Sequence, residues 1–137
     1  MNDLDQLECL IVDDDEDDQE FFSAAIRKTS FKNYNCTFAG DGAEALEKLT
    51  AGLRPTCIFL DLNMPRINGM DCLAAIRKQQ AYNNIPVAIY TTSDDVSTRA
   101  QALSLGATTF ITKPDTLSGL TNKIEDFFKS YIQPQPD

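Results

Sequence analysis

The stretch Thr56-Cys57-Ile58-Phe59-Leu60-Asp61 decides the fold class of this chain. It is a short apolar run without polar alternation, and a single carboxylate closes it. Such a run is typical of a β-strand that is covered on both faces, as in a parallel sheet between two layers of helices. Three further apolar runs are also closed by a polar residue, which is Asp13, Thr91 or Lys113.

Amphipathic segments separate these runs, and the alternation predicts βαβ units of the α/β class with five strands and five helices. The predicted strands are residues 7–12, 35–39, 56–60, 87–91 and 109–112. The first helix is predicted to start near Glu16, because apolar residues follow it at spacings of three and four.

Short-range signals mark the helix boundaries. Asp41, with a glutamate three residues later, has the form of a capping box. Asn68 and Thr92 are each followed by an acid at the same spacing, so we predict that they also act as N-caps. Gly52 and Gly106 follow helical patterns and are predicted to end them.

Composition excludes several function classes. The 137 residues correspond to one domain. The formal net charge of -9 opposes direct nucleic-acid binding, which needs a basic patch. No apolar run approaches the length of a membrane span, and the N-terminus lacks an apolar signal segment, so we expect a cytoplasmic protein without membrane contact. The four cysteines form no Cys-x-x-Cys pair and the chain has no histidine, which favours buried reduced thiols over a zinc site.

Polar groups at the ends of parallel strands meet at one edge of the sheet. Asp13, Asp14, Asp61, Thr91 and Lys113 are therefore expected to converge on one cleft. Three neighbouring carboxylates repel one another, and a divalent cation with oxygen ligands relieves that repulsion. The pattern predicts a site for a divalent cation and a phosphoryl group.

The remaining acids of this region are predicted to be only the solvated start of a helix. They are Asp15, Asp17 and Asp18. A register with Asp14 and Asp15 as the metal-binding pair is the alternative, but the apolar strand ends at Val12, which favours Asp13 and Asp14.

In these motifs the chain resembles the receiver domain of two-component response regulators, over residues 7–131. The motifs are Leu10-Ile11-Val12-Asp13-Asp14, Leu60-Asp61-Leu62-Asn63-Met64-Pro65 with Gly69, Tyr90-Thr91-Thr92-Ser93 and Lys113-Pro114. The resemblance implies a flavodoxin-like (βα)5 fold, with a doubly wound five-stranded parallel sheet in the order 2-1-3-4-5. In that order the chain reverses direction between strands 1 and 3, where ligands bind in open α/β sheets. Residues 1–6 are expected to form an N-terminal extension and residues 132–137 a disordered tail.

The resemblance also implies a Mg²⁺ site. Asp14 and Asp61 would bind the ion directly and Asp13 at least through water. Asn63 would contribute its backbone carbonyl, which leaves its side chain less constrained. Gly69 would permit a backbone turn before the third helix.

The resemblance further implies that Asp61 accepts a phosphoryl group and that Thr91 and Lys113 contact it. For the Lys113-Pro114 bond the sequence alone favours trans, since only about 5–6% of such bonds are cis, whereas the resemblance implies cis, which would aim the lysine inward. Movement of Thr91 would open a void beneath the fourth strand, and Phe110, three residues before the lysine, is the expected switch aromatic that fills it. An ordinary core role for Phe110 stays open.

By the same resemblance, a sensor histidine kinase or a histidine phosphotransfer protein supplies the phosphoryl group. With no chain expected for an output domain after residue 131, the signal would pass to an unidentified downstream protein or through a homodimer, using the face of the fourth helix, fifth strand and fifth helix. A phosphorelay intermediate is a close variant. The segment Gln79–Asn84 lengthens the link between the third helix and the fourth strand. With Leu62-Asn63 and Thr91-Thr92-Ser93, it is similar to stand-alone regulators of the phytochrome-associated kind.

Two other function classes compete with this non-enzymatic switch. A Mg²⁺-dependent phosphatase with an aspartyl intermediate commonly places a second aspartate two residues after its nucleophile, as general acid. Asn63 stands at that position and cannot donate a proton comparably. A phosphate-independent interaction module would have no need to keep all the polar groups of the cleft.

Overall fold

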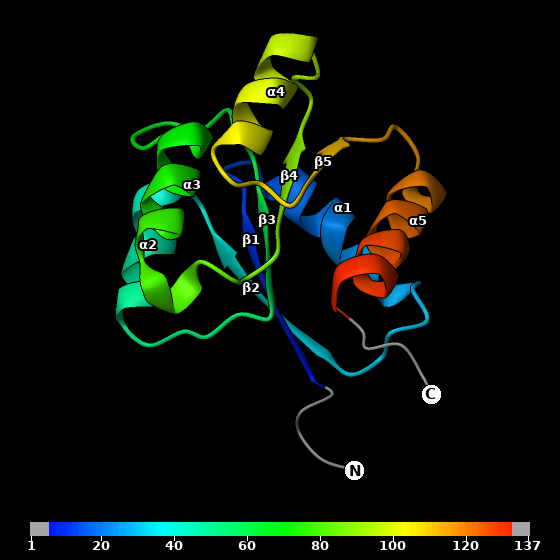
Figure 1. The fold of residues 1–137 in the computed structure, drawn as a ribbon. Helices are drawn as coiled ribbons and strands as arrows, with labels where there is room; N and C mark the ends of the chain where they lie inside the picture. The colour runs from blue at the N-terminus through cyan, green and yellow to red at the C-terminus, as the bar shows by residue number, and fades with distance from the viewer. Residues whose placement is uncertain (1–5, 133–137) are drawn as a thin grey trace.

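Five parallel strands form one sheet in the order β2-β1-β3-β4-β5 (Figure 1). The computed structural model describes residues 6–132, so the predicted N-terminal extension (residues 1–6) and disordered tail (residues 132–137) lie outside the described residues except for Gln6 and Ile132. The strands are β1 (Leu7–Val12), β2 (Tyr34–Ala39), β3 (Cys57–Leu60), β4 (Val87–Thr91) and β5 (Thr109–Thr112). The predicted α/β class and strand order are confirmed, and the chain reverses direction between β1 and β3.

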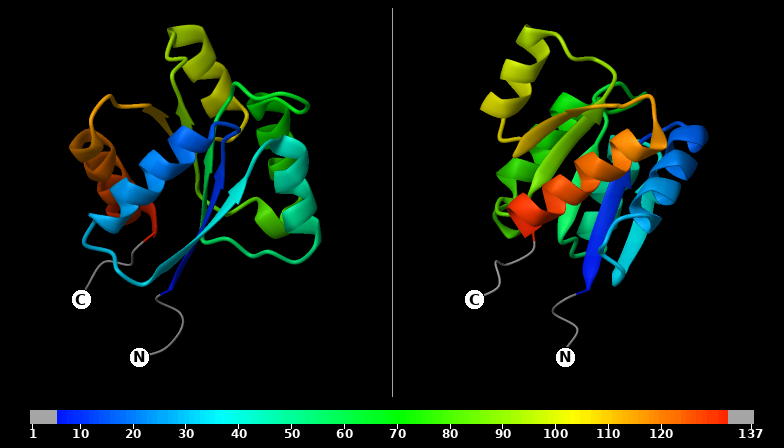
Figure 2. Two further views of the ribbon diagram at one scale, coloured as in Figure 1. Left: turned by 180° about the vertical axis from the view of Figure 1, so that it is seen from behind. Right: turned by 90° about the vertical axis from the view of Figure 1, so that its right-hand side faces the viewer.

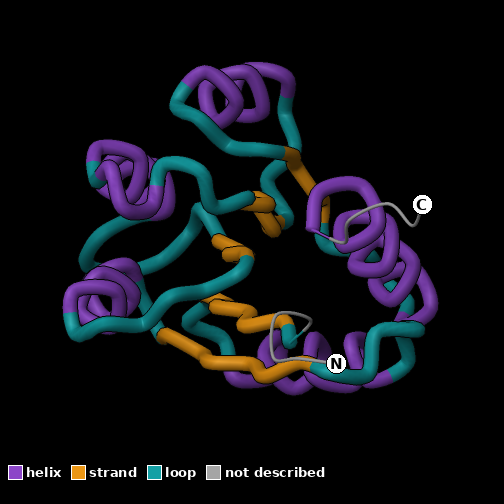
Figure 3. Tube along the Cα trace, turned by 60° about the horizontal axis from the view of Figure 1, so that its bottom comes forward, coloured by secondary structure: helices purple, strands orange, loops and turns teal. Residues whose placement is uncertain are grey.

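Helices cover both faces of the sheet, as the second and third views show (Figures 2 and 3). They are α1 (Glu16–Arg27), α2 (Gly42–Thr50), α3 (Gly69–Lys78), α4 (Val96–Ser104) and α5 (Leu117–Phe127), with a 3-10 turn at Gln80–Tyr82 and a π-helical turn at Phe128–Ile132. Helices α1 and α5 pack on one face, and α2, α3 and α4 contribute to the core on the other. Within residues 6–132, the helices are too short or too polar to cross a membrane.

β3 and β4, two of the three interior strands, are buried on both faces, as their continuous apolar sequences predict. Every residue of β3 and β4 is buried. On the α1–α5 face the ring of Phe59 packs edge-on against Phe22, with centroids 4.7 Å apart, and against Phe127 at 5.1 Å. This rigid centre fixes the positions of the residues that follow β3 and β4.

Most of the predicted helix boundaries are confirmed. The Asp41 carboxylate accepts the backbone N–H of Glu44 at 2.8 Å, and Asn68 caps α3 through its side-chain oxygen. Gly52 and Gly106 follow α2 and α4 with φ of 117° and 109°. The prediction for Thr92 is wrong, because α4 begins later and Asp95 is its N-cap. Two acceptors with similar spacing compete here, and the one adjacent to Val96 is used.

Two strands also begin one residue away from their predicted starts. β2 starts at Tyr34 and β3 at Cys57. Thr56 instead uses its hydroxyl oxygen to accept the backbone N–H of Glu8 at 3.0 Å. It thus ties the start of β3 to β1 although it lies outside the strand.

Gly69 has a different role from the turn predicted for it. It is the first residue of α3, and a Cβ at this position would lie 2.3 Å from the backbone oxygen of Asp61. Such a distance is impossible for a real side chain, so a close approach of two backbones requires the glycine. The start of α3 is thereby pressed against the chain that leaves β3.

The four cysteines are free thiols, as predicted. Cys9, Cys57 and Cys72 are buried, whereas Cys36 is partly exposed. Burial raises the pKa of Cys72 to about 12, so this thiol remains protonated and unreactive at neutral pH.

Candidate functional site

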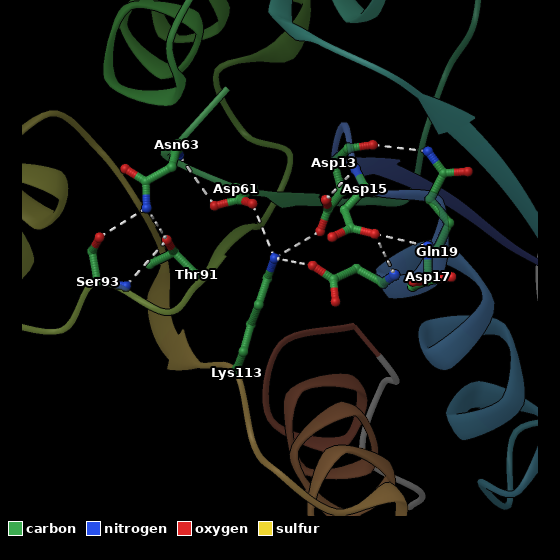
Figure 4. A network of polar contacts seen from close by, with 10 residues as sticks. Asp13, Asp15, Asp17, Gln19, Asp61, Asn63, Thr91, Ser93 and Lys113 are labelled. Carbon is green, nitrogen blue, oxygen red and sulfur yellow. Dashed lines mark hydrogen bonds and ion pairs between the residues drawn. The ribbon is translucent and has the colours of Figure 1, made fainter. Parts of the chain in front are cut away.

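The strands deliver their polar groups to one edge of the sheet (Figure 4). Asp13 directly follows β1 and Asp61 directly follows β3. Val12 pairs with Leu60 in the parallel register, so the two aspartates leave the sheet at the same level. Thr91 is the last residue of β4. The convergence predicted from the strand ends is therefore present.

Three carboxylates crowd together at the switch point between β1 and β3. Asp13 is fully buried and Asp61 is 5% exposed, whereas Asp14 lies on the surface. Each offers an oxygen within 4.8 Å of the others. Burial raises the pKa of Asp13 to about 6, although hydrogen bonds from the Asp15 backbone and from Lys113 oppose the shift.

Lys113 follows β5 and reaches into this group of acids. Its Nζ lies 2.9 Å from Asp13, 3.0 Å from Asp61 and 2.7 Å from Asp18. Burial alone would lower the pKa of this ammonium, but hydrogen bonds to three carboxylates outweigh burial and raise the pKa above its ordinary value. The Nζ also lies 5.1 Å from the ring centroid of Tyr90, within the range of a cation–π contact.

Thr91 is fully buried beneath a small polar network. Its Oγ1 accepts a hydrogen bond of 3.3 Å from the Asn63 side chain and one of 3.4 Å from the Ser93 backbone. The same Asn63 amide donates to Ser93 Oγ at 2.8 Å. The expectation that the Asn63 side chain is less constrained is therefore wrong, because it joins the loop after β3 to the loop after β4.

Comparison with known proteins identifies this arrangement. A sequence model of the family described as "Response regulator receiver domain" matches residues 9–125. The chain belongs to this family. The "Response regulator MprA" of Mycobacterium leprae (strain TN) is 35% identical to this receiver domain over 109 residues, which are 80% of this chain and 46% of the relative. The chain thus spans about half the length of the curated relatives it matches.

Solved structures agree with the receiver assignment. The phosphorylated cyanobacterial phytochrome response regulator RcpA superposes with a TM-score of 0.82 at 25% identity, covering 92% of this chain and 94% of that chain. The Vibrio cholerae chemotaxis protein CheY4 gives 0.77 at 27% identity, covering 88% and 98%. The Mn(2+)-bound response regulator Rcp1 shares the fold, with a TM-score of 0.80 at 22% identity, and the alignment covers 95% and 97%.

The acids of this receiver domain form a donor set suited to a hard cation. Asp13, Asp14 and Asp61 supply only oxygen ligands, and their oxygens are close enough to share one ion. Mg²⁺ prefers such ligands and keeps several waters, which the exposed position of Asp14 allows. The residues therefore fit the ion that the sequence predicts.

Sequence reasoning missed one member of the receiver site. Asp18 was expected to be solvated, yet it makes the shortest of the contacts to Lys113. The prediction of a solvated helix start agrees better with Asp15 and Asp17, because Asp15 caps α1 and Asp17 is exposed. Asp18 lies one residue after Asp17 in the first turn of α1 and is only partly exposed. No pattern in the chain distinguishes these acids, since the turn of α1 alone selects which one faces Lys113.

The Lys113-Pro114 bond is trans, so the expectation of a cis bond is wrong. The trans form is intrinsically favoured even before proline. The long lysine side chain contacts Asp13 and Asp61 with this geometry, and no cis bond is required to aim it.

Phe110 is half-buried on β5, next to Ile89 of β4 in the sheet register. The guanidinium of Arg99, on α4, lies 4.7 Å from the centroid of its ring. The aromatic predicted as a switch thus contacts the helix that follows Thr91, and it packs only partly into the core.

Proposed function

We propose that this receiver domain is a phosphoryl-accepting signalling switch. Asp61 takes the phosphoryl group from a sensor histidine kinase or from a histidine phosphotransfer protein. The observation that supports this proposal is the position of Asp61 at the carboxyl edge of the sheet, where its carboxylate lies close to the acids that follow β1 and 3.0 Å from the ammonium of Lys113.

An Asp61 carboxylate oxygen attacks the phosphorus of a phosphohistidine. The new P–O bond forms as the P–N bond breaks, and the imidazole leaves with the bonding pair and takes up a proton. Lys113 donates to one phosphoryl oxygen and the Thr91 hydroxyl to another. The Thr91 hydroxyl proton is available for this contact, because its oxygen already accepts from Asn63 and Ser93.

The metal ligands in this proposal are the carboxylates of Asp13, Asp14 and Asp61 and the backbone carbonyl of Asn63. Bound Mg²⁺ would supply positive charge that neutralises the transferring group. The Asn63 backbone N–H donates to Asp61 Oδ1 at 3.2 Å, which holds the loop beside the acceptor and orients that carboxylate.

The output of the switch runs through the face formed by α4, β5 and α5. Thr91 precedes α4, and Phe110 contacts Arg99 of that helix. A shift of the Thr91 hydroxyl would therefore change the packing at this face. Large apolar side chains are exposed there: Val96 and Leu103 on α4 and Tyr131 after α5. A downstream protein or a second copy of the chain would bind this face.

The cysteines of the described residues are free thiols, which suits a reducing compartment, so we propose that the protein is cytoplasmic.

A phosphatase that uses Asp61 as nucleophile is less well supported. The residue two positions later is Asn63, whose side chain cannot act as a general acid and is already held by Thr91 and Ser93. The protein is therefore proposed as a signalling component, with only its own phosphorylation and dephosphorylation as chemistry.

The test is incubation with Mg²⁺ and a small acyl-phosphate donor, followed by measurement of intact mass. We expect wild type to gain one phosphoryl group and Asp61→Asn to gain none. Asp94→Asn is the matched control, because Asp94 is exposed and contacts Thr112 instead of the cluster. A folded wild-type protein that binds Mg²⁺ without gaining mass would refute the switch.

A further inference from the structure

Lys113 uses all of its hydrogen-bonding capacity on carboxylates. An ammonium has three N–H donors and no acceptor. The three contacts go to Asp13, Asp18 and Asp61, and the one to Asp18 is the shortest at 2.7 Å. No donor of Lys113 is left for a phosphoryl oxygen until one of these contacts opens (Figure 4).

The three acceptors are not equivalent. Asp13 and Asp61 belong to the group whose oxygens could share one cation, and Asp18 does not. Asp18 also comes from helix α1, whereas the other two directly follow strands. A divalent cation would therefore compete with Lys113 for Asp13 and Asp61 but leave Asp18 available.

The competition matters because Lys113 is poorly solvated. Its side chain is 10% exposed. A buried ammonium that loses its partners without replacement is strongly destabilised. A hydrogen-bond acceptor for Lys113 that is not a ligand of the cation would lower the free-energy cost of displacing Lys113 from Asp13 and Asp61 when the cation binds.

We propose that Asp18 is a positioning residue that supplies this resting place. When a divalent cation occupies Asp13 and Asp61, Asp18 keeps one hydrogen bond to Lys113 and holds the ammonium on the α1 side of the site. Two N–H donors are then free to meet a phosphoryl oxygen. The cation part of this inference stands on the contacts of Lys113, and only the phosphoryl part rests on the proposed function.

Among the described residues, the ion pairs of Lys113 are with Asp13, Asp18 and Asp61, so without the Asp18 carboxylate its remaining charged partners are the cation's own ligands. The ammonium then remains on Asp13 and Asp61, and the cation must displace it. Asp18→Asn should therefore weaken cation binding through Lys113, in addition to the small effect of losing one negative charge. Asp17 provides the control for that charge effect, because it is exposed in the same turn of α1 and none of the described ion pairs joins it to Lys113.

The test is a double-mutant cycle on Mg²⁺ affinity, measured by isothermal titration calorimetry without any phosphoryl donor. The proteins are wild type, Asp18→Asn, Lys113→Met, the double variant and Asp17→Asn. We expect Asp18→Asn to weaken Mg²⁺ binding about threefold or more in wild type, the size of a contact between coupled residues. In the Lys113→Met background, and for Asp17→Asn, the loss should stay below about twofold, as for a screened surface charge.

Equal losses from Asp18→Asn in both backgrounds would overturn the inference, because Asp18 would then act by charge alone. A loss no larger than that of Asp17→Asn, or a wild type that binds no Mg²⁺ at millimolar concentration, would overturn it too. If circular dichroism shows that Asp18→Asn is not folded, Asp18→Ser takes its place in the cycle.

The same proteins separate this inference from the proposed function. A wild type that binds Mg²⁺ and shows the coupling, yet gains no mass from an acyl phosphate, would refute the phosphoryl switch. The positioning of Lys113 by Asp18 would still stand on the binding data.

Discussion

At the scale of the residue, one ammonium compensates several carboxylates at the carboxyl edge of the sheet, where Asp13, Asp61 and the Lys113 side chain are nearly buried and Asp14 is exposed. Asp13 is fully buried, and Lys113 is the cation that compensates it. Thr91 lies on the opposite side of Asp61 and is held by Asn63, an interaction that couples the two loops around the acceptor. Small displacements of either side chain would therefore alter the hydrogen bonds of the whole cleft.

Phe110→Ala tests whether that displacement is transmitted. The ring of Phe110 lies against the guanidinium of Arg99, and Phe110 is neither the acceptor nor a metal ligand of the proposed site, so we expect phosphorylation of Asp61 to be unchanged. Binding of the downstream partner should lose its dependence on phosphorylation, because the contact to α4 is removed.

The measurement is partner affinity with and without acyl phosphate, with intact mass as the measure of phosphorylation. Tyr34→Ala is a control, since Tyr34 is a partly buried aromatic on the opposite edge of the sheet. A Phe110→Ala protein whose phosphorylation still changes partner affinity as in wild type would contradict the switch role.

At the scale of the element, the helices are fixed to the sheet by a few specific contacts. The start of α3 presses against the chain after Asp61, with Gly69 at the point of contact. Helix α5 is joined to the loop after α1 through Glu125, whose carboxylate accepts from both the backbone N–H and the hydroxyl of Ser30. These contacts set the position of elements that themselves carry no reactive group.

Gly69→Ala should destabilise the fold by about 2–4 kcal/mol, because the added carbon would overlap backbone that cannot move freely. The free energy of unfolding from urea titration measures this loss. Gly40→Ala is the matched control, because its added carbon would meet only the flexible end of Glu44 at 3.4 Å. Equal stabilities of the two variants would contradict the close approach at Gly69.

Glu125 gives the link between α1 and α5 a pH dependence. The hydroxyl and the backbone N–H of Ser30 lower the pKa of Glu125 below its ordinary value of 4.5. A lowered pKa in the folded state means that the stabilisation is complete above the ordinary value and is lost as the pH falls through the lower, folded value.

We therefore expect Glu125→Gln to cost about 1 kcal/mol at pH 7, and the difference from wild type to shrink towards pH 3. Urea unfolding at several pH values measures the difference. Glu20→Gln, the same chemical change at an exposed position of α1, is the matched control. A difference that stays constant from pH 7 to pH 3 would argue against the Ser30 contact.

At the scale of the whole molecule, helices cover both faces of the sheet, so the charged side chains that follow the strands lie together at its carboxyl edge. Because the acids repel one another, the folded chain should be more stable with Mg²⁺ bound. At a free Mg²⁺ concentration one hundred times the dissociation constant, the gain is about 2.7 kcal/mol. Thermal unfolding with Mg²⁺ and then with excess chelator measures it, and Asp61→Asn should show a much smaller response.

Self-association is tested at the same scale. If the exposed apolar side chains of α4 and the end of α5 bind a second copy, the mass from light scattering should rise with concentration once the protein is phosphorylated. Val96→Asp should abolish the rise, since Val96 is 83% exposed and its replacement would not disturb the core. A monomer mass at all concentrations, with and without acyl phosphate, would exclude the dimer.

Apolar patterning was enough to predict a parallel sheet, because buried parallel strands need continuous apolar runs and leave their polar residues at one edge, whereas the strand order came from the family resemblance. The sequence also placed Asp61 and Lys113 at the same cleft. It did not reveal Asp18, since several acids share one helical turn and only the orientation of α1 selects between them. It misplaced the cap of α4 for a similar reason, as Thr92 and Asp95 are both able to accept and the three-dimensional path of the loop decides.

The triple contact of Lys113 has a consequence for genetics. In the proposed switch, a Lys113 substitution removes a contact to the phosphoryl group, and it also leaves several uncompensated acids around a buried edge. A loss of stability of only 1–2 kcal/mol can change protein abundance several-fold through degradation. A screen for loss-of-function alleles would thus recover Lys113 for two unrelated reasons: the lost contact to the phosphoryl group and the lower abundance of the protein. Asp61→Asn removes the proposed acceptor and also relieves the repulsion among the carboxylates. A loss-of-function phenotype of that allele, measured at normal protein abundance, therefore reports signalling alone.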